Sequence, residues 1–244
     1  MAEIIGRLER LRRYPVKSMA GEDLESVYIS ENGIVGDRLC GYRLSGVESD
    51  FVSRRYLTAR NAPELLLCRP SIADEPSRSE AYPESYRPRI EIELPEIFGL
   101  NKIVGVEDSQ LIKFLEEHYG VSLQVDYQKG IFDQKAISLV GMPSLEALKV
   151  DPLRFRENMY ISWDKEPLYE DSLVGKVIRI GDEVRVSIDE QCKRCVMVNI
   201  DPNSAEKDNS VLKAIGSYNK ARLGVYGSVL QQGIVREGDA IYLE

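Results

Sequence analysis

Apolar and polar residues alternate along much of this chain, which is the pattern of strands that bury one face. Val184, Val186 and Ile188 alternate with polar neighbours, and residues 196–200 repeat the pattern. The segments 177–182 and 234–239 each run from apolar residues into a Gly-Asp pair, which predicts the turn of a barrel hairpin. The chain is therefore predicted to be mainly β.

Helical spacing is confined to a few segments. Residues 108–119 carry apolar residues three and four apart and are followed by Gly120, which predicts a helix that ends there. Ser144 is expected to cap a short helix over 145–148, and Ser210 to cap another. The predicted fold class is mainly β with a few helices (α+β).

The stretch 70–88, which contains proline and serine, predicts a loop or boundary. We expect two β-barrel-like lobes that meet near this loop and the helix after it. The corresponding domain division is 1–100 and 101–244.

Composition limits the possible classes of protein. The 244 residues are 43% hydrophobic and 30% charged, as in ordinary folded soluble proteins. No segment has the apolar length of a membrane span, and the opening residues lack an apolar signal segment, so we expect a cytoplasmic protein with no membrane partner. The net charge of −8 predicts no nucleic-acid partner. Four cysteines are too few for a disulfide scaffold, so reduced thiols are expected.

The most reactive segment is predicted to be Cys192-Lys193-Arg194-Cys195, because two cations between two thiols favour the thiolate. Four interpretations remain open. A structural zinc site would need Cys40 and Cys68, or His118, as further ligands. A thioredoxin-like dithiol would need a helix N-terminus, whereas this pair lies between two alternating segments. The other two are inert half-buried thiols and one thiolate bound to a softer metal.

Basic residues with neighbouring hydroxyl or amide donors form four clusters near predicted turns. Each one alone is typical of a solvated surface, but together they are unexpected in an acidic chain and suit a phosphate or other polyanion. The clusters are Lys17-Ser18, Gly36-Asp37-Arg38, Thr58-Ala59-Arg60, and Arg154 to Asn158.

Other candidates are weaker. His118 is the sole histidine, which excludes a His-rich metal site and most His-based triads. Glu170 and Asp171 could act as acid–base groups, but a solvated turn is the expected role. Rossmann and Walker glycine patterns are absent.

Taken in order, these residues resemble the MOSC family, named for the C-terminal domain of molybdenum-cofactor sulfurase. Residues 1–100 resemble the β-barrel domain that precedes MOSC in many members, and residues 101–244 resemble MOSC itself. The matching segments are 14–18, 33–38, 58–63, 144–145, 154–158, 170–171, 192–195, 201–202, 224–226 and 233–239.

The resemblance implies a molybdenum cofactor, a pyranopterin-dithiolene molybdenum with a terminal phosphate. In relatives such as the mitochondrial amidoxime-reducing component, the second cysteine of the motif is the metal ligand, and here that residue is Cys195. The phosphate and pterin would be held by a set of polar residues, with further cofactor-binding residues nearby. The first set is Lys17, Ser18, Arg38 and Arg156, and the second is Arg60, Asn158 and Arg194.

Two departures from the family pattern fall near this set. Glu157 replaces a usual proline, which is expected to shift Asn158. Leu173 replaces a common tryptophan, which is expected to change the wall of the pocket.

The resemblance implies an oxidoreductase in which Cys195 is catalytic. Its small-molecule substrate would be an N-hydroxylated or N-oxide compound. The electrons would come from a separate electron-donor protein, because the chain has no flavin, haem or iron–sulfur signature. The alternative is a molybdenum-cofactor or sulfur carrier, in which Cys195 holds a persulfide or a cofactor in transit. A plain dithiol redox protein is the third interpretation.

Overall fold

Seven strands form a closed barrel in the computed structural model, which describes residues 3–74, 87–100, 102–127 and 135–244 (for 52 and 53, the backbone only). Around the barrel the order is β1-β11-β10-β14-β13-β12-β16, and pairing of β1 with both β11 and β16 closes it. Only β10 and β11 run parallel; the other neighbours are antiparallel. The barrel strands are β1 (Glu3–Arg13), β10 (Ile137–Gly141), β11 (Met159–Ser162), β12 (Val177–Ile180), β13 (Val184–Lys193), β14 (Arg222–Gln231) and β16 (Ala240–Leu243).

Smaller sheets lie beside the barrel. The strands outside it are β2 (Glu22–Asp23), β3 (Ser26–Ser30), β4 (Gly33–Ile34), β5 (Cys40–Leu44), β6 (Arg69–Ile72), β7 (Ile90–Glu93), β8 (Ile103–Gly105), β9 (Leu123–Tyr127) and β15 (Gly233–Arg236). They pair as β15-β3-β4, β5-β9 and β6-β7-β8, while β2 extends the edge of β1.

The helices are short. The α-helices are α1 (Val52–Arg55), α2 (Ser109–Tyr119), α3 (Met142–Leu148) and α4 (Ser210–Asn219). The described residues also form 3-10 helices at Pro63–Leu67, Glu96–Phe98, Pro152–Phe155, Tyr169–Leu173 and Val196–Asn199. None of the helices in this part of the chain has the length and apolar character needed to cross a membrane.

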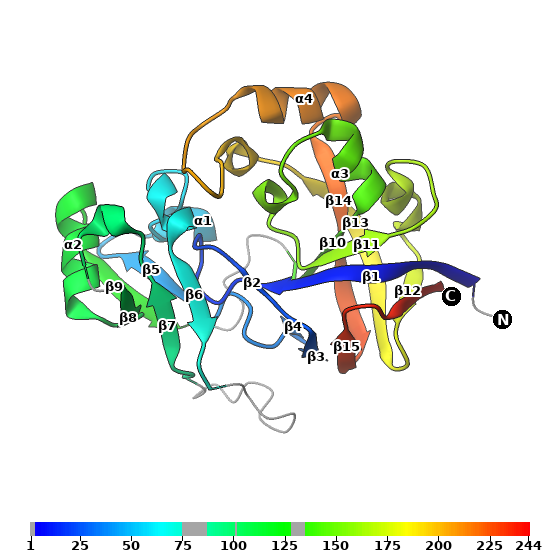
Figure 1. Cartoon of the computed structure of the whole chain (residues 1–244), viewed down its shortest axis with the longest axis horizontal. Coiled ribbons are helices and arrows are strands. Elements are labelled where there is room, and N and C mark those ends of the chain that lie inside the picture. Colours follow the sequence, from blue (N-terminus) through cyan, green and yellow to red (C-terminus); the bar gives the residue numbers. More distant parts are fainter. Residues whose placement is uncertain (1–2, 75–86, 101, 128–134) are drawn as a thin grey trace.

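Two lobes are visible in Figure 1, one with α2 and β5 to β9, the other with the barrel beneath α3 and α4. A single buried apolar cluster nevertheless runs through both lobes, from Leu8 and Val186 in the barrel to Leu65 and Leu115. The lobes therefore share one core. The division at residues 100 and 101 stays a prediction, because β1 belongs to the barrel built by the second half.

The predicted class, mainly β with a few helices and barrel-type architecture, is confirmed. The segment 177–182 does lead into a hairpin, in which β12 pairs with β13. The helix over 108–119 is also confirmed: the Asp108 carboxylate accepts from the amides of the first turn, and Gly120 adopts the left-handed conformation that ends the helix.

Other local predictions are wrong. Of residues 196–200, Val196–Asn199 form a 3-10 helix and not a strand, and Ile200 makes an isolated bridge with Lys207. After 234–239 no hairpin forms, because β15 pairs with β3 while β16 pairs with β1 and β12. Ser144 lies inside α3, where its hydroxyl donates to the buried Glu170 carboxylate (2.9 Å). Ser210 is the first residue of α4, and Asn209 occupies the cap position.

The predicted loop at 70–88 falls only partly within the described residues. Residues 70–72 belong to β6, and 75–86 lie outside the described ranges.

Closure of the barrel depends on a close approach at Gly6, where β1 passes from β16 to β11. In Gly6→Ala the new Cβ would lie 2.6 Å from the Ser162 carbonyl oxygen, a backbone atom that cannot turn away. We expect the free energy of unfolding, measured by urea denaturation, to fall by about 1–3 kcal/mol. In the control Gly105→Ala, the Cβ meets nothing within 4 Å, and we expect a change below about 1 kcal/mol. Equal losses in the two variants would contradict this account.

Candidate functional site

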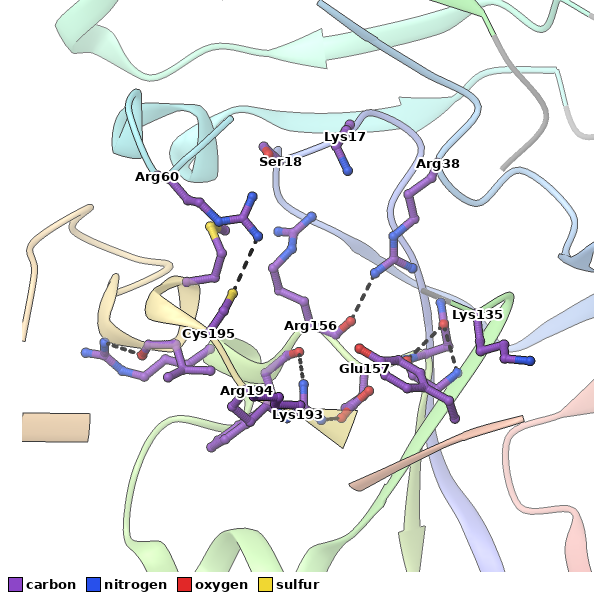
Figure 2. Close-up of a pocket in the computed structure, with 17 residues that line it drawn as sticks. Lys17, Ser18, Arg38, Arg60, Lys135, Arg156, Glu157, Lys193, Arg194 and Cys195 are labelled. Carbon is purple, nitrogen blue, oxygen red and sulfur yellow. Dashed lines mark hydrogen bonds and ion pairs between the residues drawn. The ribbon is translucent and has the colours of Figure 1, made fainter. Parts of the chain in front are cut away.

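One cavity gathers polar residues from both halves of the chain (Figure 2). All eight residues predicted from the sequence line it: Lys17, Ser18, Arg38, Arg60, Arg156, Asn158, Arg194 and Cys195. The other described lining residues are Lys135, Ser138, Arg154, Phe155, Glu157, Lys193, Met197, Val198 and Tyr226. Eight of the seventeen are basic and one is acidic, in a protein of net charge −8. The cavity is therefore a concentrated cationic site, and the role of each residue in it stays a prediction.

Three of the lining residues are held in the left-handed backbone conformation without being glycine. Ser18 follows the end of β1, Arg38 follows a tight turn, and Arg156 ends the 3-10 helix Pro152–Phe155, with φ values of 68°, 46° and 58°. Each such residue costs of order 1–3 kcal/mol and persists only where its surroundings hold it. The backbone of Arg38 is held in this conformation in part by a hydrogen bond from its amide to the Tyr14 carbonyl (2.8 Å).

Tyr14 links the basic residues of the two halves. The guanidinium carbons of Arg38 and Arg156 lie 4.5 and 4.4 Å from the centre of its ring, and its hydroxyl donates to the Glu157 carbonyl (3.1 Å). Arg38 also donates to the Arg156 carbonyl (3.1 Å). Burial lowers the pKa of Arg156 to about 10, so this side chain is still a cation at neutral pH. The aromatic ring thus holds two cations close together.

Asn158 is buried and already bonded on all sides. Its side-chain oxygen accepts from the amide and hydroxyl of Ser138, at 3.3 and 3.1 Å. Its amide nitrogen donates to the Asp37 carboxylate (3.1 Å) and the Arg12 carbonyl (3.3 Å). The Asp37 carboxylate in turn forms an ion pair with Arg38. We interpret Asn158 as a residue that positions Arg38 through Asp37, because both of its amide hydrogens are already used.

Glu157, which stands where the family pattern has proline, is buried beside Asn158. Its buried carboxylate pairs with Arg194, whose guanidinium also donates to the Leu223 and Phe155 carbonyls (2.8 and 3.1 Å). Burial lowers the pKa of Arg194 to about 10. The ion pair with Glu157 thus fixes the position of Arg194, the residue that precedes Cys195. At Gly224 an added Cβ would lie 2.7 Å from the Glu157 carboxylate, so a side chain there would disturb the pair.

The four cysteines differ in their exposure to solvent. Cys195 is exposed, whereas Cys40, Cys68 and Cys192 are buried. Burial raises the pKa of Cys68 to about 12 and that of Cys192 well above its usual value. Arg60 donates to the Cys195 sulfur at 3.5 Å (Figure 2). Cys195 is therefore the one cysteine that combines exposure with a place in the cavity.

The competing thiol interpretations gain no support from this arrangement. In the described part of the chain no three His, Cys, Asp or Glu residues lie close enough to hold a metal ion together. Cys192 is buried while Cys195 is exposed, so the two thiols do not share one environment.

One other expectation is wrong, and two further residues considered from the sequence lie outside the cavity. Glu170 does not lie in a solvated turn: it is fully buried, accepts from Ser144, and burial raises its pKa. Leu173 is buried in the main core and is not among the described residues that line the cavity. His118 lies on α2, stacked on Phe114, and is not in the lining.

Sequence reasoning missed Lys135, Ser138 and Tyr226 as residues of the cavity. Lys135 is a single basic residue outside the four basic clusters, and its ammonium group also pairs with Asp189 (3.3 Å). Ser138 and Tyr226 face one another in register on β10 and β14. That pairing is nonlocal, so no pattern near either residue could have revealed it.

The fold and site together define a barrel protein with a cationic cavity and one accessible thiol. Residues 116–242 match the MOSC domain, and residues 5–97 match the MOSC N-terminal beta barrel domain. The chain belongs to the MOSC family. No curated protein matches it.

Among solved structures, the YUAD protein from Bacillus subtilis is similar in fold, with a TM-score of 0.52 and 12% sequence identity over 100% of this chain and 98% of that one. YiiM from Geobacillus stearothermophilus is similar over 45% of this chain and 54% of its own, with 20% identity and a TM-score of 0.35.

The exposure of the four thiols predicts which of them reacts. In the native protein we expect a maleimide to label one cysteine, Cys195, and to label all four after unfolding, because burial and raised pKa values protect the other three. Intact mass and peptide mapping would count and place the labels. Cys195→Ser should abolish native labelling, and Cys192→Ser should leave it unchanged. Fast native labelling of Cys192 would refute the assignment.

Proposed function

We propose that this chain is a molybdenum-cofactor-binding oxidoreductase that reduces N-hydroxylated or N-oxide compounds. The observation that carries the proposal is the exposed thiol of Cys195 in a cavity lined by eight basic side chains. MOSC domains are associated with molybdenum-cofactor-binding proteins, which supports the choice of ligand.

The donor set fits such a cofactor. Guanidinium and ammonium groups suit a phosphate, and a thiolate suits a soft metal. Lys17, Ser18, Arg38 and Arg156 would hold the phosphate and pterin, and Cys195 would bind molybdenum. When bound, the cofactor would supply two-electron redox chemistry at its metal.

The remaining groups of the cavity would position these residues. Asn158 and Asp37 would orient Arg38, the Tyr14 ring would keep Arg38 beside Arg156, and Arg60 would orient the Cys195 sulfur. Arg38, Arg156 and Cys195 are thus held by contacts within the protein, so the site would be formed before the ligand arrives.

The overall reaction consumes two electrons and two protons. An N-hydroxyl compound would give the N–H compound and water, and an N-oxide would give the free nitrogen base and water. Both electrons would come from a separate electron-donor protein, which reduces this protein between turnovers.

A carrier of molybdenum cofactor or sulfur is the second candidate, and the exposure of Cys195 favours it. A thiol that hands sulfur or cofactor to another protein must be reachable from outside, and Cys195 is the exposed cysteine of the chain. Transfer to an acceptor apoprotein without turnover would identify the carrier.

The first test concerns the metal. In protein expressed where molybdenum cofactor is made, Cys195→Ser should lose most of its molybdenum, because the variant removes the proposed ligand. Cys192→Ser should keep most of it, since Cys192 is buried outside the lining. Elemental analysis and circular dichroism would measure metal and fold together. Equal metal loss in two folded variants would contradict a ligand role specific to Cys195.

The second test concerns the electrons. Cofactor-loaded protein should not reduce pyridine N-oxide with NADPH alone, because the electrons require a separate donor. It should reduce pyridine N-oxide when a reduced viologen dye supplies the electrons, and the loss of the dye's absorbance measures the reaction. Direct turnover with NADPH would refute the proposed electron supply. Absence of turnover with any reductant, with molybdenum bound, would leave the carrier as the better function.

A further inference from the structure

The charges on the wall of the cavity discriminate between ligands of opposite sign. Among the described residues that line it, Glu157 is the only acidic one, and it is buried and paired with Arg194. Other basic lining residues also have carboxylate partners: Arg38 pairs with Asp37, Arg154 with Asp201 and Lys135 with Asp189. None of these three carboxylates belongs to the described lining. A cationic substrate would therefore meet basic groups without an accessible carboxylate to receive it.

Lys193 differs from the other basic residues of the cavity. It is exposed and precedes Cys195 by two positions, and within the described ranges its side chain has no ion pair or hydrogen bond. Its charge is therefore not neutralised by a contact within this part of the protein.

A second cation stands opposite Lys193. At the end of the β13–β14 ladder, Lys193 is the register partner of Arg222, which likewise has no side-chain partner among the described residues. Like charges directly opposite each other destabilise a sheet. An anion near this end of the ladder would relieve the repulsion, and the cavity beside Cys195 is where Lys193 can meet one.

We infer that the substrate of this site is an anion, an N-hydroxylated or N-oxide compound that carries a carboxylate, and that Lys193 is the residue that selects it. The inference rests on the proposed function for the reaction itself. The carboxylate takes no part in the redox step; it attracts and orients the molecule so that its N–O group lies near Cys195. Neutral and cationic analogues would bind more weakly, because they forgo this attraction or are repelled.

The preference of the site for an anion can be tested without turnover. The experiment uses the full-length protein, expressed in a host that makes no molybdenum cofactor. Iodoacetate and iodoacetamide attack the same thiolate but differ in charge, so the ratio of their rates at Cys195 reports the local field. We expect this ratio to exceed that of N-acetylcysteine amide and to fall with added salt. Lys193→Gln should lower the ratio about fivefold at low salt, as for one unit charge acting at about 4 Å in water.

A matched control separates a local effect from one of net charge. Lys113→Gln removes the same charge from α2, in the other lobe, and should leave the ratio unchanged. Cys195→Ser should abolish the reaction that is being measured. A ratio equal to that of the small thiol, or equal ratios in the two lysine variants, would overturn the inference.

Substrate choice is then measured on cofactor-loaded protein with reduced viologen. Pyridine N-oxide, its 4-carboxylate and a derivative bearing a trimethylammonium group form a neutral, anionic and cationic series. We expect the carboxylate to have the highest kcat/KM through a lower KM, and Lys193→Gln to remove that advantage while Lys113→Gln keeps it. A preference for the neutral or cationic compound would overturn the inference. If none of the three were reduced, the proposed reductase function would fail, and the alkylation ratio would still decide the charge selectivity of the site.

Discussion

The pairing of β1 with β11 and β16 is the constraint on which the rest of the molecule depends. It closes a barrel whose other six strands come from the second half of the chain. Beyond the last paired residues, the Arg12 amide donates to the Asn158 carbonyl (2.8 Å), so the ladder continues to the edge of the cavity. The segment that follows β1 therefore arrives beside Arg156. Without this pairing, the two sets of basic residues would belong to separate lobes.

The sequence predicts well those elements whose determinants lie within a short segment of the chain. The β12–β13 hairpin and α2 depend on local alternation, a tight turn and end caps, and all of these follow from neighbours in sequence. The lining of the cavity was also largely foreseeable. Lysine and arginine clusters beside turns are unexpected in an acidic chain, and their order along it resembles one family.

Part of what the sequence could not predict depends on partners far along the chain. Residues 196–200 alternate like a strand, yet only Ile200 makes a bridge, to Lys207, and Val196–Asn199 form a 3-10 helix directly after Cys195. The ion pair of Glu157 could not be foreseen because its partner, Arg194, lies 37 positions further along the chain. Ser144 is a residue type that often caps a helix, but here its hydroxyl donates to the buried Glu170 carboxylate. For Glu157 and Ser144, the sequence shows the residue but not the distant group that it contacts.

The left-handed backbone at Ser18, Arg38 and Arg156 has a consequence for how this protein can change. Glycine adopts this conformation without steric cost, so at these positions it would relieve backbone strain. Glycine would also remove a hydroxyl or guanidinium from the cavity. At Arg38 it would also leave the buried Asp37 carboxylate without its ion pair, so relief of backbone strain comes with the loss of contacts that the side chains make. Engineering for robustness would therefore have to find its gains elsewhere, for instance in the exposed loops, to leave the cavity intact.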